Sequence, residues 1–348
     1  MGRAVYCAVD SGKFATKIAW TNEDFTKVQK CQFRTKMSAG NMLDDNIENG
    51  TYVCQIGDEI FKIGNGAQRY ADLVTSKKSP IHKNCTLLAL ALLASDSGDD
   101  EFHVAIGMPV DEYGVVDNRI DYMKYMLPQG ETTVLYRTQK TDIITKKFKI
   151  VSSHVYPESA GGLYLNASRN KDSAAIIDIG SLNVNLTMFQ GFEVDKDYSI
   201  TGELGGQILV SNLAAELSAS LGTRCTDILV SRVLKSPLEQ RYLVPNIPNP
   251  DIEEKSFQII NEYLLKHVSD IKRLADSKKW SLDFIPLTFI GGTSEILANE
   301  IRKVFGESVF IPSSPEYTNA LGFLKRIVAY ETDVELSIET ESASRPAA

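Results

Sequence analysis

The chain has 348 residues, of which 43% are hydrophobic and 24% are charged, as is typical of a folded globular protein. Its formal net charge of -8 gives no electrostatic argument for direct binding to nucleic acid. Five cysteines without C-x-x-C spacing indicate reduced thiols rather than a disulfide framework or a zinc site. The longest apolar run, residues 87–94, is too short to span a membrane, and we expect a soluble cytoplasmic protein with no membrane partner.

Much of the acidic excess lies at the C-terminal end. Within residues 331–348, Arg345 is the single basic residue, and the acidic residues are Glu331, Asp333, Glu335, Glu339 and Glu341. We expect residues 331–348 to form a solvated acidic tail that is disordered beyond about Glu335.

Strand and helix patterns alternate along the whole chain, which predicts an α/β protein. In the first half we expect two strands joined by a turn at 11–13, strands near 28–35, 52–56 and 60–63, a helix over 84–95, a strand over 102–110, a helix over 117–126, strands to about 154, and a helix over 158–169. In the second half we expect strands over 174–180 and 184–190, a helix over 205–221, an extended proline-containing segment over 235–256, a helix over 256–276, a strand ending at 292, a helix over 294–305, a strand near 309–311, and a helix over 315–329.

An internal repeat divides the chain. Residues 9–18, VDSGKFATKI, align without gaps with residues 177–186, IDIGSLNVNL. Both segments have an apolar residue, Asp, a variable residue, Gly, a turn and a second strand. Two halves of the chain are therefore predicted to begin with the same β-hairpin.

Each repeat places a carboxylate and a glycine at the end of a buried strand. Gly12 and Gly180 lack a Cβ atom, so the turn is free to adopt positive φ and a phosphate can approach the backbone. Backbone N–H groups at such a turn can cradle phosphate oxygens. Asp10 and Asp178 are suited to hold a hydrated Mg²⁺ ion, which uses few carboxylates. One such hairpin alone is more often ordinary, with its Asp capping the turn, but two in register favour a clamp for a triphosphate between two domains.

Three further segments accompany the hairpins. In IGGTSEIL, residues 290–297, two glycines allow a flat ring or a sugar to lie against the backbone. In VYPESAGGLYL, residues 155–165, Glu158 enters a helix whose small residues suit a close helix crossing or a hinge. In ITGELGGQIL, residues 200–209, Gly205 and Gly206 start a helix and offer another place for phosphate or ribose. Each segment also has an ordinary structural interpretation as a turn, a first-turn acid or a helix start.

Together these five segments, in this order and spacing, resemble the actin-like ATPase superfamily over residues 4 to about 329. Residues 105–113, 157–159 and 313–326 look most like ParM-type plasmid-segregation actins. The resemblance implies an α/β, actin-like fold of two related domains, each with a mixed sheet flanked by helices, and a nucleotide in the interdomain cleft. Domain I would comprise residues 1–165 and 316–330, domain II residues 166–315, and the acidic tail the rest.

The resemblance also implies roles for individual residues. Asp10 and Asp178 would hold Mg²⁺ through its water shell, and Lys17 would reach the β- and γ-phosphates. Glu158 would orient or activate the attacking water, so these four residues are the catalytic candidates. The nucleotide would be ATP, with GTP left open, and its binding residues would be Ser11, Gly12, Lys13, Gly180, Ser181, Gly205, Gly206, Gly291, Gly292 and Thr293.

The function implied by the resemblance is that of a nucleotide-hydrolysing protein. Such a protein polymerises with bound Mg-nucleotide into filaments and moves plasmid DNA through a DNA-binding adaptor. Two alternatives share the same fold: a small-molecule kinase, which transfers the phosphate to a cosubstrate, and a nucleotide switch that forms no filaments.

Overall fold

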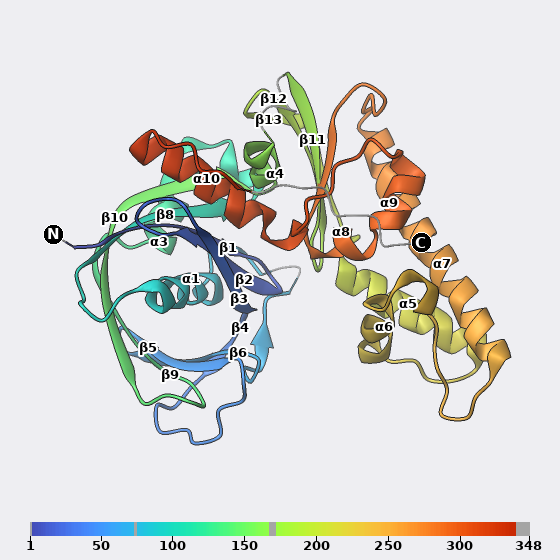
Figure 1. The fold of residues 1–348 in the computed structure, drawn as a ribbon, viewed down its shortest axis with the longest axis horizontal. Helices are drawn as coiled ribbons and strands as arrows, with labels where there is room; N and C mark the ends of the chain where they lie inside the picture. The colour runs from blue at the N-terminus through green and yellow to red at the C-terminus, as the bar shows by residue number, and fades with distance from the viewer. Residues whose placement is uncertain (1, 73–74, 167–171, 339–348) are drawn as a thin grey trace. The chain divides into compact units, whose positions relative to one another are not determined.

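A computed structural model describes residues 2–72, 75–166 and 172–338 of the chain (Figure 1). These residues form two compact units. Unit 1 contains the described residues up to 166 together with those from Tyr317 onward, and unit 2 contains those from 172 to Glu316. The sequence placed the two crossings between the domains at 165/166 and 315/316.

Unit 1 is built on a mixed sheet with the strand order β3-β2-β1-β8-β10-β9-β5-β6-β4-β7. Its central strands β1, β8 and β10 are parallel. The two short strands β4 and β7 are additions to the prediction. The strands are β1 (Ala4–Ser11), β2 (Ala15–Thr21), β3 (Val28–Arg34), β4 (Lys36–Ala39), β5 (Thr51–Ile56), β6 (Glu59–Gly64), β7 (Arg69–Tyr70), β8 (Asp100–Met108), β9 (Gly130–Arg137) and β10 (Ile144–Pro157).

Helices cover both faces of this sheet. Figure 1 shows the sheet curving around α1, while α10 lies along the opposite face of β1 and β8. Helix α1 begins four residues earlier than predicted, because Pro80 occupies the first helical position, where its fixed φ suits a helix start. The helices of this unit are α1 (Pro80–Leu93), α2 (Val110–Tyr113), α3 (Val116–Met126), α4 (Ala160–Leu165) and α10 (Thr318–Thr332), and the short 3-10 turn η3 (Pro315–Tyr317) precedes α10.

The expected close helix crossing is confirmed between α4 and α10. A Cβ atom on Gly161 would lie 2.3 Å from the Cα atom of Asn319, and one on Gly322 would lie 2.2 Å from the carbonyl oxygen of Gly161. Only glycine at both positions allows the two backbones to approach this closely. Helix α4 ends at Leu165, and the remainder of the predicted helix from 167 to 169 lies outside the described residues.

Unit 2 contains a sheet with the strand order β13-β12-β11-β14. Strand β13 and helix α6 were not predicted, and β13 is difficult to recognise because it is a polar edge strand with no buried residue. Its strands are β11 (Ser173–Ile179), β12 (Val184–Gln190), β13 (Glu193–Gly202) and β14 (Leu287–Ile290). Its helices are α5 (Gly206–Leu221), α6 (Asp227–Leu234), α7 (Pro250–Ser277), α8 (Gly292–Ile296) and α9 (Ala298–Phe305), with the 3-10 turn η2 (Leu238–Gln240).

Helix α7 corrects the predicted extended segment over 235–256. It starts at Pro250, and the side chain of Asn249 caps it by accepting a hydrogen bond from the amide of Ile252. The prolines that suggested an excursion therefore include a helix-initiating one. Although α7 has 28 residues, neither it nor any other described helix has the length and apolar content needed to cross a membrane. The single helix expected over 294–305 is instead two, α8 and α9, which meet at Leu297.

The internal repeat is confirmed at the level of strand register. Strand β1 is antiparallel to β2 and parallel to β8, and β11 is likewise antiparallel to β12 and parallel to β14. Asp10 lies opposite Lys17 in the first hairpin, and Asp178 lies opposite Asn185 in the second. The two units therefore contain equivalent hairpins, with a lysine opposite the aspartate in one and an asparagine in the other.

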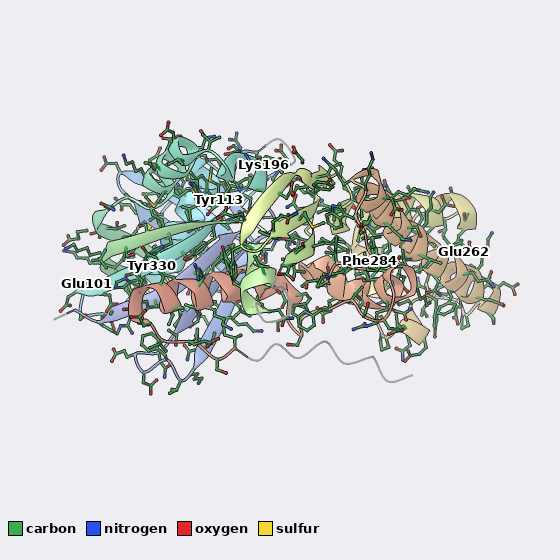
Figure 2. All side chains as sticks on the ribbon, turned by 90° about the horizontal axis from the view of Figure 1, so that it is seen from above. Glu101, Tyr113, Lys196, Glu262, Phe284 and Tyr330 are labelled. Carbon is green, nitrogen blue, oxygen red and sulfur yellow. The ribbon has the colours of Figure 1, made fainter. Side chains whose placement is uncertain are left out.

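The acidic tail is shorter than predicted. Helix α10 runs to Thr332, and Figure 2 shows Tyr330 on its last turns. The carboxylate of Glu331 accepts a hydrogen bond from Ser152 and lies 2.6 Å from Nε2 of His154, and Leu336 is buried. Burial raises the pKa of Glu331, but the hydrogen bonds from Ser152 and His154 outweigh it, so the pKa is lower than usual. Residues 331–338 are thus part of unit 1, and the remainder of the expected tail, 339–348, lies outside the described residues.

Two truncations should distinguish the contribution of residues 331–338 to stability from that of residues 339–348. A chain ending after Tyr330 loses the contacts of Glu331 and the buried side chain of Leu336, which alone corresponds to about 1.5–3 kcal/mol of unfolding free energy. A chain ending after Ile338 keeps both and serves as the control. Urea denaturation of the two chains and the full-length protein measures the difference. Equal stability of all three would show that residues 331–338 contribute nothing to the folding of unit 1.

Candidate functional site

The first hairpin, β1–β2, presents an ion pair at the end of the central sheet of unit 1. Asp10 is buried, and its Oδ2 atom lies 3.2 Å from Nζ of Lys17. The pair follows from the register, because the two residues are direct neighbours on adjacent antiparallel strands. The Asp10 carboxylate therefore offers oxygen donors at the end of β1 that can hold a cation or its water shell.

The glycines of the two hairpin turns have a different purpose from the one expected. Neither Gly12 nor Gly180 has positive φ. Their amides donate within the turns, to the carbonyl oxygens of Ala15 at 3.1 Å and Asn183 at 2.9 Å. A Cβ atom would lie 2.9 Å from the Ala15 oxygen in the first turn and 3.2 Å from the Asn183 oxygen in the second. A side chain at position 12 would therefore clash with the closed turn, and one at position 180 would crowd it. Because both amides donate within their turns, they are not free to cradle a phosphate.

Glu158 is held beside the first hairpin by a lysine that the sequence interpretation missed. Nζ of Lys77 lies 2.8 Å from Oε1 of Glu158 and donates to the carbonyl oxygen of Ser11, also at 2.8 Å. The side chains of Lys77 and Glu158 are only 11% and 14% exposed. Nothing in the sequence distinguishes Lys77 from its neighbour Lys78, since neither belongs to a recognisable motif. Lys77 thus joins the turn after β1 to the carboxylate that follows β10.

Other charges gather around this pair. Burial lowers the pKa of Lys13, and the nearby charge of Lys77 lowers it further, while Glu158 and Asp72 act in the opposite direction. The buried hydroxyl of Tyr122 donates to the carbonyl oxygen of Gly107, and its pKa is raised by burial and by the charges of Glu158 and Asp10. Unit 1 therefore brings together its predicted site residues Asp10, Ser11, Gly12, Lys13, Lys17 and Glu158 and adds Lys77.

Unit 2 brings together the three predicted glycine-containing segments. The amide of Gly206 donates to the carbonyl oxygen of Gly180 at 2.9 Å, and the amide of Gly205 donates to that of Leu182 at 3.0 Å. The hydroxyl of Thr293 donates to the same Gly180 oxygen at 3.1 Å. A Cβ atom on Gly206 would lie 2.3 Å from Oγ1 of Thr293. The start of α5, the second hairpin turn and the start of α8 are therefore fastened to one another.

Asp178 lies against the third of these segments. Gly291 has a φ of 86°, which favours glycine, and a Cβ atom there would lie 2.5 Å from Oδ1 of Asp178. The amide of Gly291 donates to the carbonyl oxygen of Pro315 at 2.8 Å. A Cβ atom on the next residue, Gly292, would meet only an ordinary contact, with Glu316 at 3.4 Å. The predicted adenosine loop and the second aspartate are therefore adjacent within unit 2.

The residues present suit a hydrated magnesium ion better than a fully ligated metal. No group of three or more His, Cys, Asp or Glu side chains in the described part of the chain could hold a metal by itself. Each unit contains one hairpin aspartate, Asp10 in unit 1 and Asp178 in unit 2. Mg²⁺ keeps several waters and is commonly held by one or two carboxylates together with substrate phosphates, so the hairpin carboxylate of either unit fits it.

Solved structures similar to this chain share its fold across nearly their whole length. A structure described as the Alp12 filament is 21% identical, with a TM-score of 0.71, and the match covers 94% of this chain and 99% of that one. Ta0583, an archaeal actin homolog, is 16% identical with a TM-score of 0.72, covering 94% and 99%. The psk41 ParM protein in its apo form is 14% identical with a TM-score of 0.69, covering 95% and 99%. The expected actin-like fold is therefore confirmed.

A family model supports the same conclusion from the sequence side. Residues 8–161 match the model for the N-terminal domain of actin-like proteins. A search of curated proteins gave no match. The matched segment begins inside β1 and ends inside α4, so it contains both the first hairpin and Glu158. Residues 8–161 are thus similar to the N-terminal domain of actin-like proteins, and the described chain has the fold of solved actin-like structures, ParM proteins among them.

Proposed function

We propose that the chain binds a nucleoside triphosphate with Mg²⁺ through its two repeated hairpins, hydrolyses it, and assembles into filaments. The observation that carries this proposal is the repeated hairpin, in which Asp10 and Asp178 occupy equivalent positions in register. Each hairpin is accompanied in its own unit by the segments that the nucleotide would need. Lys77 and Glu158 lie beside the first hairpin, and the Gly291 loop lies beside the second.

The residues of unit 1 supply the hydrolytic chemistry in this proposal. Glu158 orients the attacking water and accepts its proton, while Lys77 holds the carboxylate in place. Lys17, which lies beside Asp10, offers its ammonium group to the β- and γ-phosphates. Mg²⁺, held through water by Asp10 and Asp178, would neutralise charge on the phosphates.

The residues of unit 2 bind the nucleoside. Gly291 and Gly292 leave the backbone open to a flat base or a sugar, and Thr293 fastens this loop to the second hairpin. Glycine backbone does not discriminate strongly between bases, so ATP is the first choice and GTP the second. The archaeal homolog Ta0583 was solved in complex with ADP, which supports an adenine nucleotide.

Filament formation and plasmid segregation extend the proposal beyond the site. Alp12 and AlfA, the latter from a B. subtilis plasmid, were both solved as filaments. Several large apolar side chains are exposed and available for contact with another copy, among them Leu43 in unit 1 and Ile228, Val244, Ile247 and Phe284 in unit 2; Figure 2 shows Phe284. An adaptor that binds DNA would link such filaments to plasmid DNA in the cytoplasm.

Nucleotide titrations test the binding part of the proposal. Fluorescent ATP and GTP analogues are titrated with Mg²⁺ present and again with EDTA. The proposal predicts saturable binding of at least one analogue that weakens when Mg²⁺ is removed. Failure of both analogues to bind would refute the proposed nucleotide site.

Substitution of Lys77 tests whether the proposed catalytic role of Glu158 depends on its ion pair with Lys77. Lys77→Met removes the cation beside Glu158 and the donor to the Ser11 carbonyl oxygen. We expect turnover to fall on the order of 10²–10³-fold, as when one preorganised charged donor is lost. The neighbouring Lys78 pairs with Asp121 at the surface, so Lys78→Met is a matched control. Phosphate release by both variants is the measurement, and equal rates would remove Lys77 from the mechanism.

A further inference from the structure

His82 is a buried imidazole that the proposed mechanism does not use. It lies in the first turn of α1 and is completely buried. Its Nδ1 atom lies 3.1 Å from Oγ of Ser11, in the turn after β1. Its Nε2 atom is also buried and has no hydrogen-bond partner among the described residues. A buried polar atom without a partner is uncommon and calls for a reason.

The unpaired atom indicates which ring nitrogen of His82 carries the proton. Burial lowers the pKa of His82 to about 3, and the charges of Lys77 and Lys13 lower it further, while an interaction with the Ser11 backbone acts in the opposite direction. The ring is therefore neutral and has one N–H group. If Nε2 carried this proton, a buried donor would be left without an acceptor, which is rarer than an unpaired acceptor. The proton therefore belongs on Nδ1, and His82 donates to the hydroxyl oxygen of Ser11.

This direction of donation decides what the Ser11 hydroxyl can do. A hydroxyl that accepts from His82 still has its own proton to donate. Among the described residues, the acceptors near this hydroxyl are Oγ1 of Thr16 at 3.3 Å and the carbonyl oxygen of His82 at 3.5 Å. Both distances exceed the 2.5–3.0 Å of a good O–H···O hydrogen bond. Oγ1 of Thr16 is moreover already 2.9 Å from the hydroxyl of Thr35. The Ser11 proton thus has no strong acceptor in the described chain.

The backbone of Ser11 is fixed at the same time. Its carbonyl oxygen accepts from Nζ of Lys77 at 2.8 Å, and the residue ends strand β1 directly after Asp10. A fixed hydroxyl donor with Lys77 and Lys13 nearby suits an anionic oxygen. A hydrogen bond to an anionic oxygen is charge-assisted and is stronger than one between neutral groups.

We propose that His82 is a positioning residue that orients the Ser11 hydroxyl to donate a hydrogen bond to a phosphate oxygen of the bound nucleotide. The inference rests on the proposed nucleotide binding at the first hairpin and adds the residue that prepares one of its donors. His82 itself does not contact the nucleotide, and its effect passes through Ser11.

Three substitutions of His82 distinguish positioning from packing. In His82→Asn the side-chain amide can place an N–H donor near the position of Nδ1, whereas in His82→Gln the amide reaches the position of Nε2. His82→Leu removes both nitrogens and leaves an apolar side chain. We expect the Asn variant to bind a non-hydrolysable ATP or GTP analogue with Mg²⁺ within about threefold of wild type. The Gln and Leu variants should bind roughly ten- to a hundredfold more weakly, as expected for the loss of one hydrogen bond to a charged group.

A double-mutant cycle with Ser11→Ala completes the test. Ser11→Ala should weaken binding as much as His82→Leu, and in the Ser11→Ala background the His82→Leu change should have no further effect. Thermal unfolding of each variant is measured in parallel, and the binding losses should not follow the changes in Tm.

Several results would overturn the inference. Wild-type binding by the Gln or Leu variant would do so, as would an equal loss in Asn and Gln. Persistence of the His82→Leu effect in the Ser11→Ala background would show that His82 acts by another route. If the Leu variant fails to fold, the comparison of Asn with Gln decides the question. Absence of nucleotide binding by the wild-type protein would contradict the proposed function itself, and the role of His82 would fall with it.

Discussion

Replacement of Glu158 by glutamine should slow nucleotide cleavage by ~10²–10⁴-fold while leaving nucleotide binding nearly unchanged. Glutamine keeps the shape of the side chain but cannot accept a proton from water. The structure places this carboxylate 2.8 Å from Nζ of Lys77, in the same unit as the first hairpin. Single-turnover phosphate release measures the chemical step, and a binding titration in the same buffer measures affinity.

The same variant links hydrolysis to filament turnover. If assembly needs the bound triphosphate and disassembly needs its cleavage, Glu158→Gln filaments should outlive those of the wild type. Glu112→Gln, at an exposed position of α2, is the control and should behave as wild type. Phosphate release at the wild-type rate would exclude Glu158 as the base. Slow release with an unchanged filament lifetime would break the proposed link between cleavage and disassembly.

Replacement of Asp178 by alanine should reduce Mg²⁺-dependent turnover on the order of 10²–10³-fold. The reason is that one of the two proposed carboxylate contacts to the water shell of Mg²⁺ is lost. Asp178 is only half-buried, and its carboxylate lies against Gly291 rather than in the apolar core of unit 2. The fold should therefore survive, as circular dichroism would show.

Metal removal supplies an internal check on this second prediction. EDTA should lower the wild-type rate toward that of Asp178→Ala and should change the variant much less. Asp172→Ala, at an exposed position just before β11, is the matched control. A variant at Asp178 that turns over nucleotide normally would show that the second hairpin is not part of a nucleotide site.

The sequence was sufficient to predict the features of the fold that depend on local pattern. The repeated Asp-x-Gly hairpins were predictable because both the apolar strands and the turns follow the same spacing. The structure then confirms more than was predicted, since Asp10 and Asp178 occupy equivalent register positions. The small residues of α4 predicted a close helix crossing, and the contact between Gly161 and Gly322 confirms it.

The features that were not predictable depend on tertiary packing. Lys77 is one of two adjacent lysines, and only the fold shows that one reaches Glu158 while the other pairs with Asp121. His82 is one of four histidines that are dispersed along the sequence. Only the packing of α1 brings its Nδ1 atom to 3.1 Å from Oγ of Ser11. The acidic composition around Leu336 suggested disorder, because composition does not reveal that one apolar residue in such a segment is buried against unit 1.

The sequence indicated that glycine matters in the hairpin turns, but it did not reveal the structural reason. Gly12 and Gly180 were expected to adopt positive φ and to offer their amides to phosphate. Their amides instead close the hairpin turns, and the residue with positive φ in this set is Gly291. A glycine in a sequence indicates that a side chain is excluded at that position or that the backbone needs an unusual φ. The neighbouring atoms that exclude the side chain are seen only in the fold.

The most direct test of the account follows phosphate release and light scattering in one sample after Mg-ATP, and in a second sample Mg-GTP, is added to the wild-type protein. Negative-stain microscopy is carried out at the scattering maximum. The account predicts that at least one nucleotide produces filaments, that phosphate is released, and that scattering decays once the triphosphate is consumed. The absence of both phosphate release and assembly with either nucleotide would contradict this prediction. Transfer of phosphate to an added cosubstrate without assembly would identify a kinase instead.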